Sequence, residues 1–217
     1  MDNNENNEMR PQFQTITTFP KVTSNFDLGN ADDYTRVLVD CYRESMRGRE
    51  TETDTDTITE RARAVIEWMM QGKKWGLLIC GSVGTGKTTM LKAIFKMLDE
   101  HRHCLRGNFY VGVMGWNSAI EITNECIHHY NLYESDASRT YLGIDDLGQE
   151  PEEINIFGSI THPLRDILLD RYERNQITII TSNLTPRDIT ERYGERVGDR
   201  LHEMMQVILF NGQSYRK

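Results

Sequence analysis

Gly81-Ser82-Val83-Gly84-Thr85-Gly86-Lys87-Thr88 matches the pattern G-x-x-x-x-G-K-[S/T] of a phosphate-binding loop. The apolar run 75–80 precedes it, and a helical pattern over about 87–101 follows it. A strand, a glycine-rich turn and a helix in this order are the context that such a loop requires. Backbone N–H groups of the loop and of the first helical turn would point at phosphate oxygens.

The loop predicts a nucleotide site with bound magnesium. Lys87 would bridge the β- and γ-phosphates, and the Thr88 hydroxyl would be a ligand of Mg²⁺. The predicted nucleotide-binding residues are Gly81, Ser82, Val83, Gly84, Thr85, Gly86, Lys87, Thr88 and Thr89.

A second run, Tyr141-Leu142-Gly143-Ile144-Asp145-Asp146, is mostly apolar and ends in two acids. Carboxylates at the carboxyl end of a buried strand lie in the crevice where open α/β sheets bind ligands. Asp145 is therefore the predicted Mg²⁺ ligand, and Asp146 the predicted general base for an attacking water.

Two further segments carry polar side chains that could face the nucleotide. Asn183 follows the apolar run 177–181 and would reach the γ-phosphate or the water, although a turn or helix-cap role before Pro186 is an equal alternative. Arg192, Arg196 and Arg200 recur every four residues and would share one helix face if a helix continues through both glycines of this segment. We favour an arginine donated to the next subunit's nucleotide over a plain solvated face.

The rest of the chain predicts an α/β fold with a five-stranded parallel sheet sandwiched by helices. The expected strands are 75–80, 109–113, 141–145, 177–181 and 207–210. The expected helices between them are 87–101, 117–130, 161–175 and 186–205.

Residues 1–57 form a predicted acidic N-terminal extension, ahead of an ATPase domain over 58–217. Of the 33 acids and 25 bases, 13 acids and 6 bases fall in residues 1–60, which leaves 20 acids and 19 bases for residues 61–217. The extension has one expected helix, 30–47, capped by Asp32 or Asp33, and a low-complexity linker, 48–57. Thr57 with Glu60 resembles a capping box for a helix that runs to about residue 70.

Composition excludes several classes of protein. No apolar run approaches the roughly 18 residues of a membrane span, and the polar, acidic start lacks the features of a secretory signal, so a cytoplasmic protein without membrane contact is expected. The four cysteines have no C-x-x-C spacing. Reduced thiols are favoured over a zinc site built with the neighbouring histidines.

With these pieces in order, the chain resembles the DnaC/IstB-type AAA+ ATPases, which are helicase loaders and transposition helpers. Five segments carry the resemblance, over about residues 58–217: 81–89, 144–148, 181–184, 194–201 and the terminal 211–216, which ends in Ser-Tyr-Arg. A lid domain after the last strand is absent, as is usual for this family.

The resemblance implies ATP and Mg²⁺ as cofactors, with Lys87 and Thr88 as Walker A and Asp145 and Asp146 as Walker B. It also implies Asn183 as sensor 1 and Arg200 as the arginine finger. Arg196 is a second candidate for the finger, and Arg216 resembles a terminal arginine of less settled role.

Three kinds of partner follow from the resemblance: other copies of the chain, assembled with ATP, a hexameric replicative helicase, and single-stranded DNA. Trp116, Tyr130 and Tyr133 would offer stacking faces to bases, although such aromatics more often pack in cores. The helix at 30–47 would be either a reduced partner-binding helix or one that packs on its own ATPase core.

The leading hypothesis is a slow ATPase that delivers the helicase onto single-stranded DNA. A transposition helper that wraps duplex DNA is the alternative, and the near-neutral charge of residues 61–217 disfavours it because duplex binding demands a strongly basic surface. A P-loop kinase is disfavoured because neither an acceptor pocket nor a lid signature is present.

Overall fold

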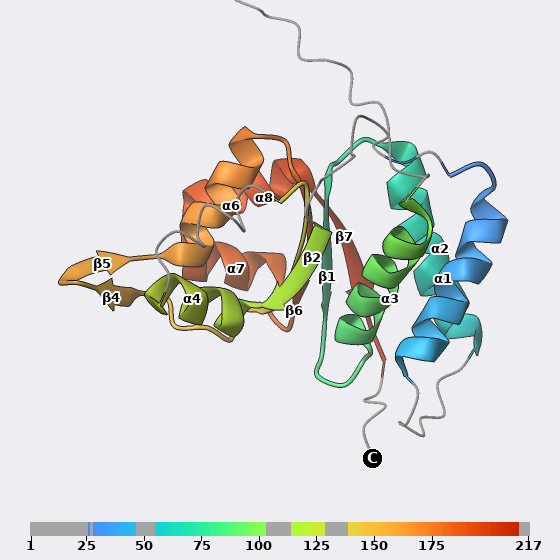
Figure 1. The fold of residues 1–217 in the computed structure, drawn as a ribbon, viewed down its shortest axis with the longest axis horizontal. Helices are drawn as coiled ribbons and strands as arrows, with labels where there is room; N and C mark the ends of the chain where they lie inside the picture. The colour runs from blue at the N-terminus through green and yellow to red at the C-terminus, as the bar shows by residue number, and fades with distance from the viewer. Residues whose placement is uncertain (1–25, 27, 47–54, 103–113, 129–138, 213–217) are drawn as a thin grey trace, which may run out of the picture.

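Continuous apolar runs form a five-stranded, fully parallel sheet in the order β2-β3-β6-β1-β7 (Figure 1). The computed structural model describes residues 26, 28–46, 55–102, 114–128 and 139–212. The strands of this sheet are β1 (Gly76–Gly81), β2 (Met114–Ser118), β3 (Tyr141–Leu147), β6 (Ile177–Ser182) and β7 (Met205–Phe210). The predicted α/β class and five-stranded parallel sheet are confirmed.

Helices cover both faces of the sheet, because alternate side chains of each strand point to opposite faces. Leu77 and Ile79 of β1 join one core, whereas Leu78 and Cys80 join the other. The first face is covered by α2 (Thr55–Gln71) and α3 (Lys87–Glu100), and α1 (Ala31–Ser45) packs on the outside of these two helices. The second face is covered by α4 (Ala119–His128), α6 (Pro163–Glu173), α7 (Pro186–Tyr193) and α8 (Glu195–Met204).

Helix α1 packs on α2 and α3 rather than standing apart from the α/β core. Leu38, Cys41 and Tyr42, which share one face of the helix, are buried against α2 and α3. The cap differs from the prediction: the Asn30 side chain, not Asp32 or Asp33, accepts a hydrogen bond from the Asp32 N–H at 2.9 Å. The outer face of α1 is charged, so any partner of this helix would meet that face.

Helix α2 begins at Thr55, so the predicted cap at Thr57 is wrong. Thr57 lies in the first helical turn, and its backbone continues the helix. The predicted domain boundary after residue 57 therefore falls inside α2. Most of the predicted linker lies outside the described residues.

The second strand lies further along the chain than the sequence predicts. The expected strand at 109–113 is outside the described residues, and the strand that pairs with β3 is Met114–Ser118. Helix α4 consequently begins at Ala119, not near Asn117. Ser118 and Glu121 form its capping box, in which each backbone N–H donates to the other side chain.

The predicted helix over 186–205 is two helices, because Gly194 has φ 90° and ψ 158° and breaks it. Arg192 therefore does not share a helix face with Arg196 and Arg200, which corrects the prediction for these three arginines. Thr185 and Asp188 form a capping box at the start of α7, and this reciprocal hydrogen bonding lowers the pKa of Asp188.

A small antiparallel hairpin, β4 (Ile154–Ile156) and β5 (Ser159–Thr161), projects from the edge of the molecule beside α4 (Figure 1). This hairpin was not predicted from the sequence. Among the helices that the structure describes, none has the length and apolar character needed to cross a membrane.

Candidate nucleotide-binding site

The loop between β1 and α3 curls at the carboxyl edge of the sheet, and two glycines make this possible. Gly84 and Gly86 have φ values of 83° and 90°, a region that side chains disfavour. A Cβ atom at Gly86 would also overlap the hydroxyl of Tyr42, which α1 brings against the loop. Ser82 and Val83 are exposed, so the outer side of the loop is open.

Lys87 is the central cation of the site. Its Nζ donates hydrogen bonds to the carbonyl oxygens of Gly81 and Ser82, both at 2.8 Å, and to Asn183 Oδ1 at 2.7 Å. Three acceptors thus surround an ammonium that has three donors. The structure therefore brings Asn183 from the end of β6 to the loop after β1.

Thr88 and Asp145 meet at the same edge. The Thr88 hydroxyl donates to Asp145 Oδ1 at 3.0 Å, and the buried Thr181 hydroxyl donates to the same oxygen at 2.5 Å. Asp145 Oδ2 has no hydrogen bond with the described residues. A hydroxyl and a carboxylate held side by side are oxygen ligands of the kind that Mg²⁺ prefers.

Asp146 lies in an irregularity of β3. The pairing with β6 shifts register between Ile144 and Leu147, and Asp146 has φ 55°, uncommon for a residue other than glycine. Its N–H donates to Thr181 Oγ1 at 2.9 Å. Successive side chains of a regular strand point to opposite faces of the sheet, and the bulge changes the direction of the Asp146 side chain from this pattern. Asp146 is half-buried, whereas Asp145 is buried.

Two side chains that hold the site together were not predicted from the sequence. Arg61 of α2 donates to the Thr85 carbonyl at 2.8 Å and to the Asn211 carbonyl at 2.7 Å, so it ties the loop to the end of β7. Its guanidinium lies 4.4 Å from the centre of the Phe210 ring. A lone arginine in a helix carries no local signal of such contacts.

The second missed residue is Glu150, whose side chain is 3% exposed. Its carboxylate accepts hydrogen bonds from the Gly148 N–H at 2.9 Å and from the Tyr193 hydroxyl, and it pairs with Arg192. Burial, and then the charge of Glu150, raise the pKa of Tyr193. This cluster joins the loop after the paired acids to the end of α7.

The two candidate arginine fingers, Arg196 and Arg200, both lie on α8, which covers the second face of the sheet. The Arg200 guanidinium lies 4.8 Å from the centre of the Tyr172 ring and pairs with Asp199 at 3.2 Å. Arg196 is exposed and has no hydrogen bond or ion pair with the described part of the chain. Both are on α8, so in a trans mechanism they would serve another copy's site.

The aromatic residues predicted to face DNA are only partly described. Trp116 is half-buried against the core, and Lys92 Nζ lies 4.9 Å from its ring centre. One face of this ring is therefore occupied within the chain. Tyr130 and Tyr133 lie outside the described residues, as does Arg216.

Three cysteines, Cys41, Cys80 and Cys126, are buried and form no disulfide within the described residues, and Cys104 lies outside them. Burial raises the pKa of the Cys80 thiol to about 11, and the nearby charge of Lys87 opposes this rise in part. In the described segments, no three His, Cys, Asp or Glu side chains gather into a metal-binding cluster.

The sheet order, the loop after β1 and the acids on β3 define a P-loop protein of the AAA+ fold. No protein-family model matches the sequence, and no curated protein does. Among solved structures, the DnaC helicase loader is similar at 20% identity and TM-score 0.56, over 78% of this chain and 98% of that one. DnaI is similar at 20% identity and TM-score 0.54, over 80% and 93%.

A DNA replication initiation factor is similar at 17% identity and TM-score 0.54, over 73% of this chain and 47% of that one. At these identities the likeness is one of fold. It confirms the expected AAA+ fold and the structural resemblance to helicase loaders across most of the chain.

Proposed function

We propose that this chain binds and hydrolyses ATP. One observation carries the proposal: Lys87 with Asn183, and Thr88 with Asp145, meet at the carboxyl edge of three adjacent strands. Ligands of open α/β sheets bind at this edge. A lysine, a hydroxyl, a carboxylate and an amide in this arrangement suit a triphosphate with its metal.

The residues present fit ATP and Mg²⁺. The N–H groups of the loop and of the first turn of α3 would bind phosphate oxygens, and Lys87 would exchange protein acceptors for phosphate. Thr88 and Asp145 would hold Mg²⁺, which when bound neutralises charge on the phosphates. Asp145 Oδ2 provides the carboxylate oxygen for this role.

Hydrolysis requires a water that is oriented and deprotonated. Asp146 would accept its proton, and Asn183 would orient the water or the γ-phosphate. Arg200, or alternatively Arg196, would stabilise the transition-state charge in a neighbouring copy's site. Turnover would therefore be slow in the monomer and would rise on assembly.

In the cell, we propose that the chain loads a hexameric replicative helicase onto single-stranded DNA. The fold likeness to the DnaC helicase loader supports this role, as does the near-neutral charge of residues 61–217. A protein that wraps duplex DNA would need a more basic surface.

Light scattering tests the proposal through the mass of the protein, with and without ATP and Mg²⁺, on single-stranded and on duplex DNA. We expect growth that requires ATP and is stronger on single strands, and none for Lys87→Ala. Growth on duplex DNA instead would favour the transposition helper. Failure of the wild-type chain to bind ATP would refute the ATPase itself.

A loading assay then tests the partner. A replicative helicase is mixed with circular single-stranded DNA, and unwinding is measured with and without this chain. We expect stimulation by the wild type and none by Lys87→Ala. Equal unwinding in all three samples would contradict the loader role and leave the ATPase intact.

A further inference from the structure

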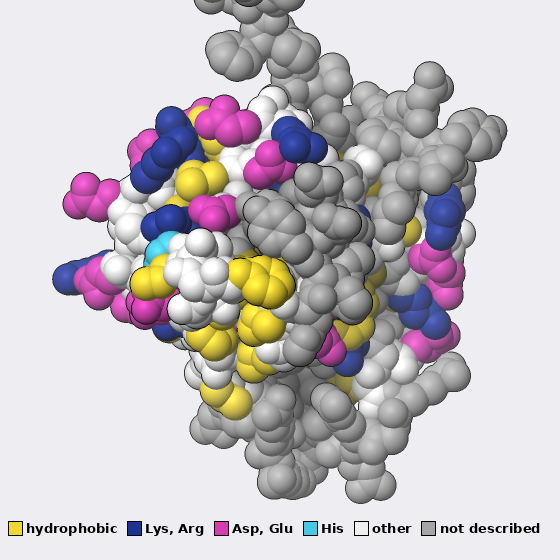
Figure 2. Space-filling model, turned by 60° about the vertical axis from the view of Figure 1, so that its left-hand side comes forward, with side chains coloured by type: hydrophobic (Ala, Val, Ile, Leu, Met, Phe, Trp, Pro, Cys, Tyr) yellow, Lys and Arg dark blue, Asp and Glu magenta, His cyan; other side chains and the backbone are white. Residues whose placement is uncertain are grey.

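The β4–β5 hairpin places an aromatic side chain fully in water. Phe157 and Gly158 form its two-residue turn with φ values of 50° and 88°, and turns of this kind favour Asn-Gly. Phe157 is 99% exposed, and Ile160 is 63% exposed. Figure 2 shows this side of the molecule, with hydrophobic side chains at the surface among charged ones.

Neither the backbone conformation nor the exposure of Phe157 stabilises the isolated chain. A large residue other than glycine in the left-handed region is strained, and an exposed phenyl ring leaves its apolar surface in water. A partner that covers this turn would remove the exposed apolar surface from water and so compensate for the strained backbone. The hairpin therefore projects two apolar side chains, Phe157 and Ile160, which we call the Phe157 knob.

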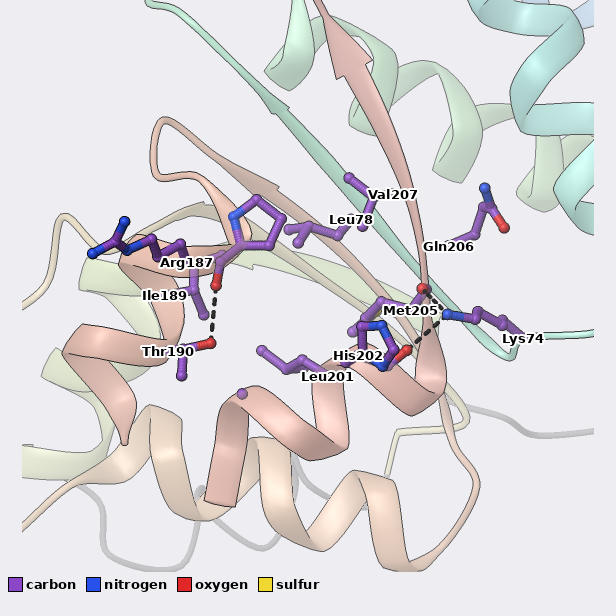
Figure 3. A pocket seen from close by; sticks show the side chains of 12 residues that line it. Lys74, Leu78, Arg187, Ile189, Thr190, Leu201, His202, Met205, Gln206 and Val207 are labelled. Atoms are coloured by element: carbon purple, nitrogen blue, oxygen red, sulfur yellow. Dashed lines mark hydrogen bonds between the residues drawn. The ribbon is translucent and has the colours of Figure 1, made fainter. Parts of the chain in front are cut away.

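An apolar groove of about 450 Å³ lies between α7, α8 and the edge strand β7 (Figure 3). Leu78, Ile189 and Leu201 form its buried floor, and Val207, 37% exposed, lies at its rim. A cavity of about 150 Å³ is enough for a benzene ring, so the groove has room for the Phe157 ring and an aliphatic neighbour.

The knob and the groove lie at opposite ends of α7 and cannot serve each other within one copy. The start of α7 borders the groove, whereas Arg192, near its end, hydrogen-bonds Glu152 at the base of the hairpin. Eight residues of helix separate the two ends by about 12 Å.

The charges of the two surfaces are complementary. Residues 151–161 contain Glu152 and Glu153 and no basic residue; Glu152 pairs with Arg192 of the same chain. The groove lining contains Lys74, Arg187 and His202 and no acid, and Arg187 pairs with Glu191 beside the groove. Glu153 and Lys74 are therefore the charges available for attraction between copies. An acidic hairpin would be repelled by nucleic acid phosphates, so charge favours the groove of a second copy over DNA.

We infer that the Phe157 knob of one copy docks in the α7–α8–β7 groove of the next copy. A knob on one surface and a groove on another make a head-to-tail contact, which generates rings or open spirals. The inference deepens the proposed self-assembly by naming its interface. It rests on that ATP-dependent self-assembly, and because the knob and the groove lie outside the nucleotide site, a failure of docking can be told from a failure of ATP binding.

Assembly with ATP and Mg²⁺ is followed by light scattering over a range of protein concentrations. Phe157→Ala and Val207→Glu should each raise the concentration at half-assembly by roughly 30-fold or more, as truncation of an interface hot spot does. Because the two residues touch across copies, their effects should not add: the double variant should assemble no worse than the single variant that assembles less well. Met70→Ala, an exposed residue on α2, is the matched control and should assemble as the wild type does.

A photoreactive phenylalanine analogue at position 157 provides a test that needs no disruptive substitution. Cross-links to residues 186–207 of a second copy are expected, and cross-links elsewhere only would overturn the inference. Phe157→Ala that assembles like the wild type would overturn the docking alone, provided its melting temperature is unchanged. A wild-type chain that never assembles would overturn both the docking and the self-assembly, whereas ATP binding is measured separately on the monomer.

Discussion

Lys87 Nζ lies 2.7 Å from Asn183 Oδ1, although 96 positions separate the two residues. The contact joins the loop after β1 to the end of β6, which is the adjacent strand of the sheet. A side chain that would sense the γ-phosphate thus already touches the lysine that would bind it. Nucleotide binding would replace this contact with one that runs through the phosphate.

Substitution of Lys87 and of Asn183 should separate binding from turnover. Lys87→Ala removes the central cation, and we expect ATP affinity to fall by roughly 30-fold or more, since a charge-assisted hydrogen bond to a buried group costs about 2 kcal/mol or more to lose. Asn183→Ala should leave affinity within a few-fold and lower the hydrolysis rate. Fluorescent-nucleotide titration and phosphate release measure the two quantities. Equal loss of affinity in both variants would contradict the assignment of Asn183.

Substitution of Asp145 and of Asp146 should likewise separate metal-dependent binding from turnover. Asp145→Asn weakens the oxygen pair with Thr88, so we expect the Mg²⁺ dependence of ATP binding to be lost. Asp146→Asn should keep binding and slow hydrolysis by roughly 10²- to 10⁴-fold, the usual contribution of a general base. Titrations with and without Mg²⁺, alongside turnover, distinguish them. Full turnover by Asp146→Asn would exclude it as the base.

Arg200 should act on a neighbouring copy's nucleotide. Arg200→Ala should lower turnover by roughly 10³-fold or more with ATP affinity unchanged, because an arginine finger contributes that much. A mixture of Arg200→Ala with Asp146→Asn should regain activity, since one copy supplies an intact arginine and the other an intact site.

Arg196→Ala is the matched control on the same helix and should have less effect. If Arg196→Ala is inactive and Arg200→Ala is active, the finger is Arg196. A mixture that stays inactive would exclude action in trans.

The sequence predicted the parts of the fold that have a local signal. Consecutive residues predict the strand that ends at Cys80, the loop that follows it, and the strand that ends in the acids at Asp145. The structure places these three segments together. Parallel topology then brings the strand ends to one edge without further information.

The missed features depend on contacts between distant segments or on a single backbone conformation. Met114–Ser118 is only half-buried, and it is a strand because its backbone pairs with β3. Gly194 ends one helix and Gly198 lies inside the next, yet both are glycines within a helical sequence pattern. The sequence alone therefore does not tell which of them breaks the helix. The Phe157 turn lacks the Asn-Gly signature, and the Glu150 cluster spans 43 positions.

The Cys80 thiol should react slowly in the folded protein. Its pKa of about 11, against an ordinary 9.0, means roughly 100-fold less thiolate at neutral pH than in the unfolded chain, and the thiolate is the reactive form. The folded state holds this proton more tightly, so stability is full below pH 9 and falls as pH rises from 9 to 11. Alkylation followed by mass spectrometry, with urea-unfolded protein as control, measures the rate. Equal rates in both states would contradict the prediction.

The buried Glu150–Tyr193 hydrogen bond should contribute more to the free energy of unfolding than a similar bond at the surface. Tyr193→Phe leaves a buried carboxylate short of a donor, and we expect a loss of about 1–3 kcal/mol in the free energy of unfolding. Tyr172→Phe is the matched control, because its hydroxyl donates to the exposed Glu203 at 2.6 Å, and its loss should stay within about 0.5 kcal/mol. Urea unfolding measures both.

Because the same carboxylate accepts the Gly148 N–H, a weakened cluster should also loosen the loop that follows Asp146. Tyr193→Phe should therefore slow ATP turnover, while Tyr172→Phe should not. A Tyr193→Phe variant no less stable than Tyr172→Phe would show that Arg192 and Gly148 alone hold the buried carboxylate.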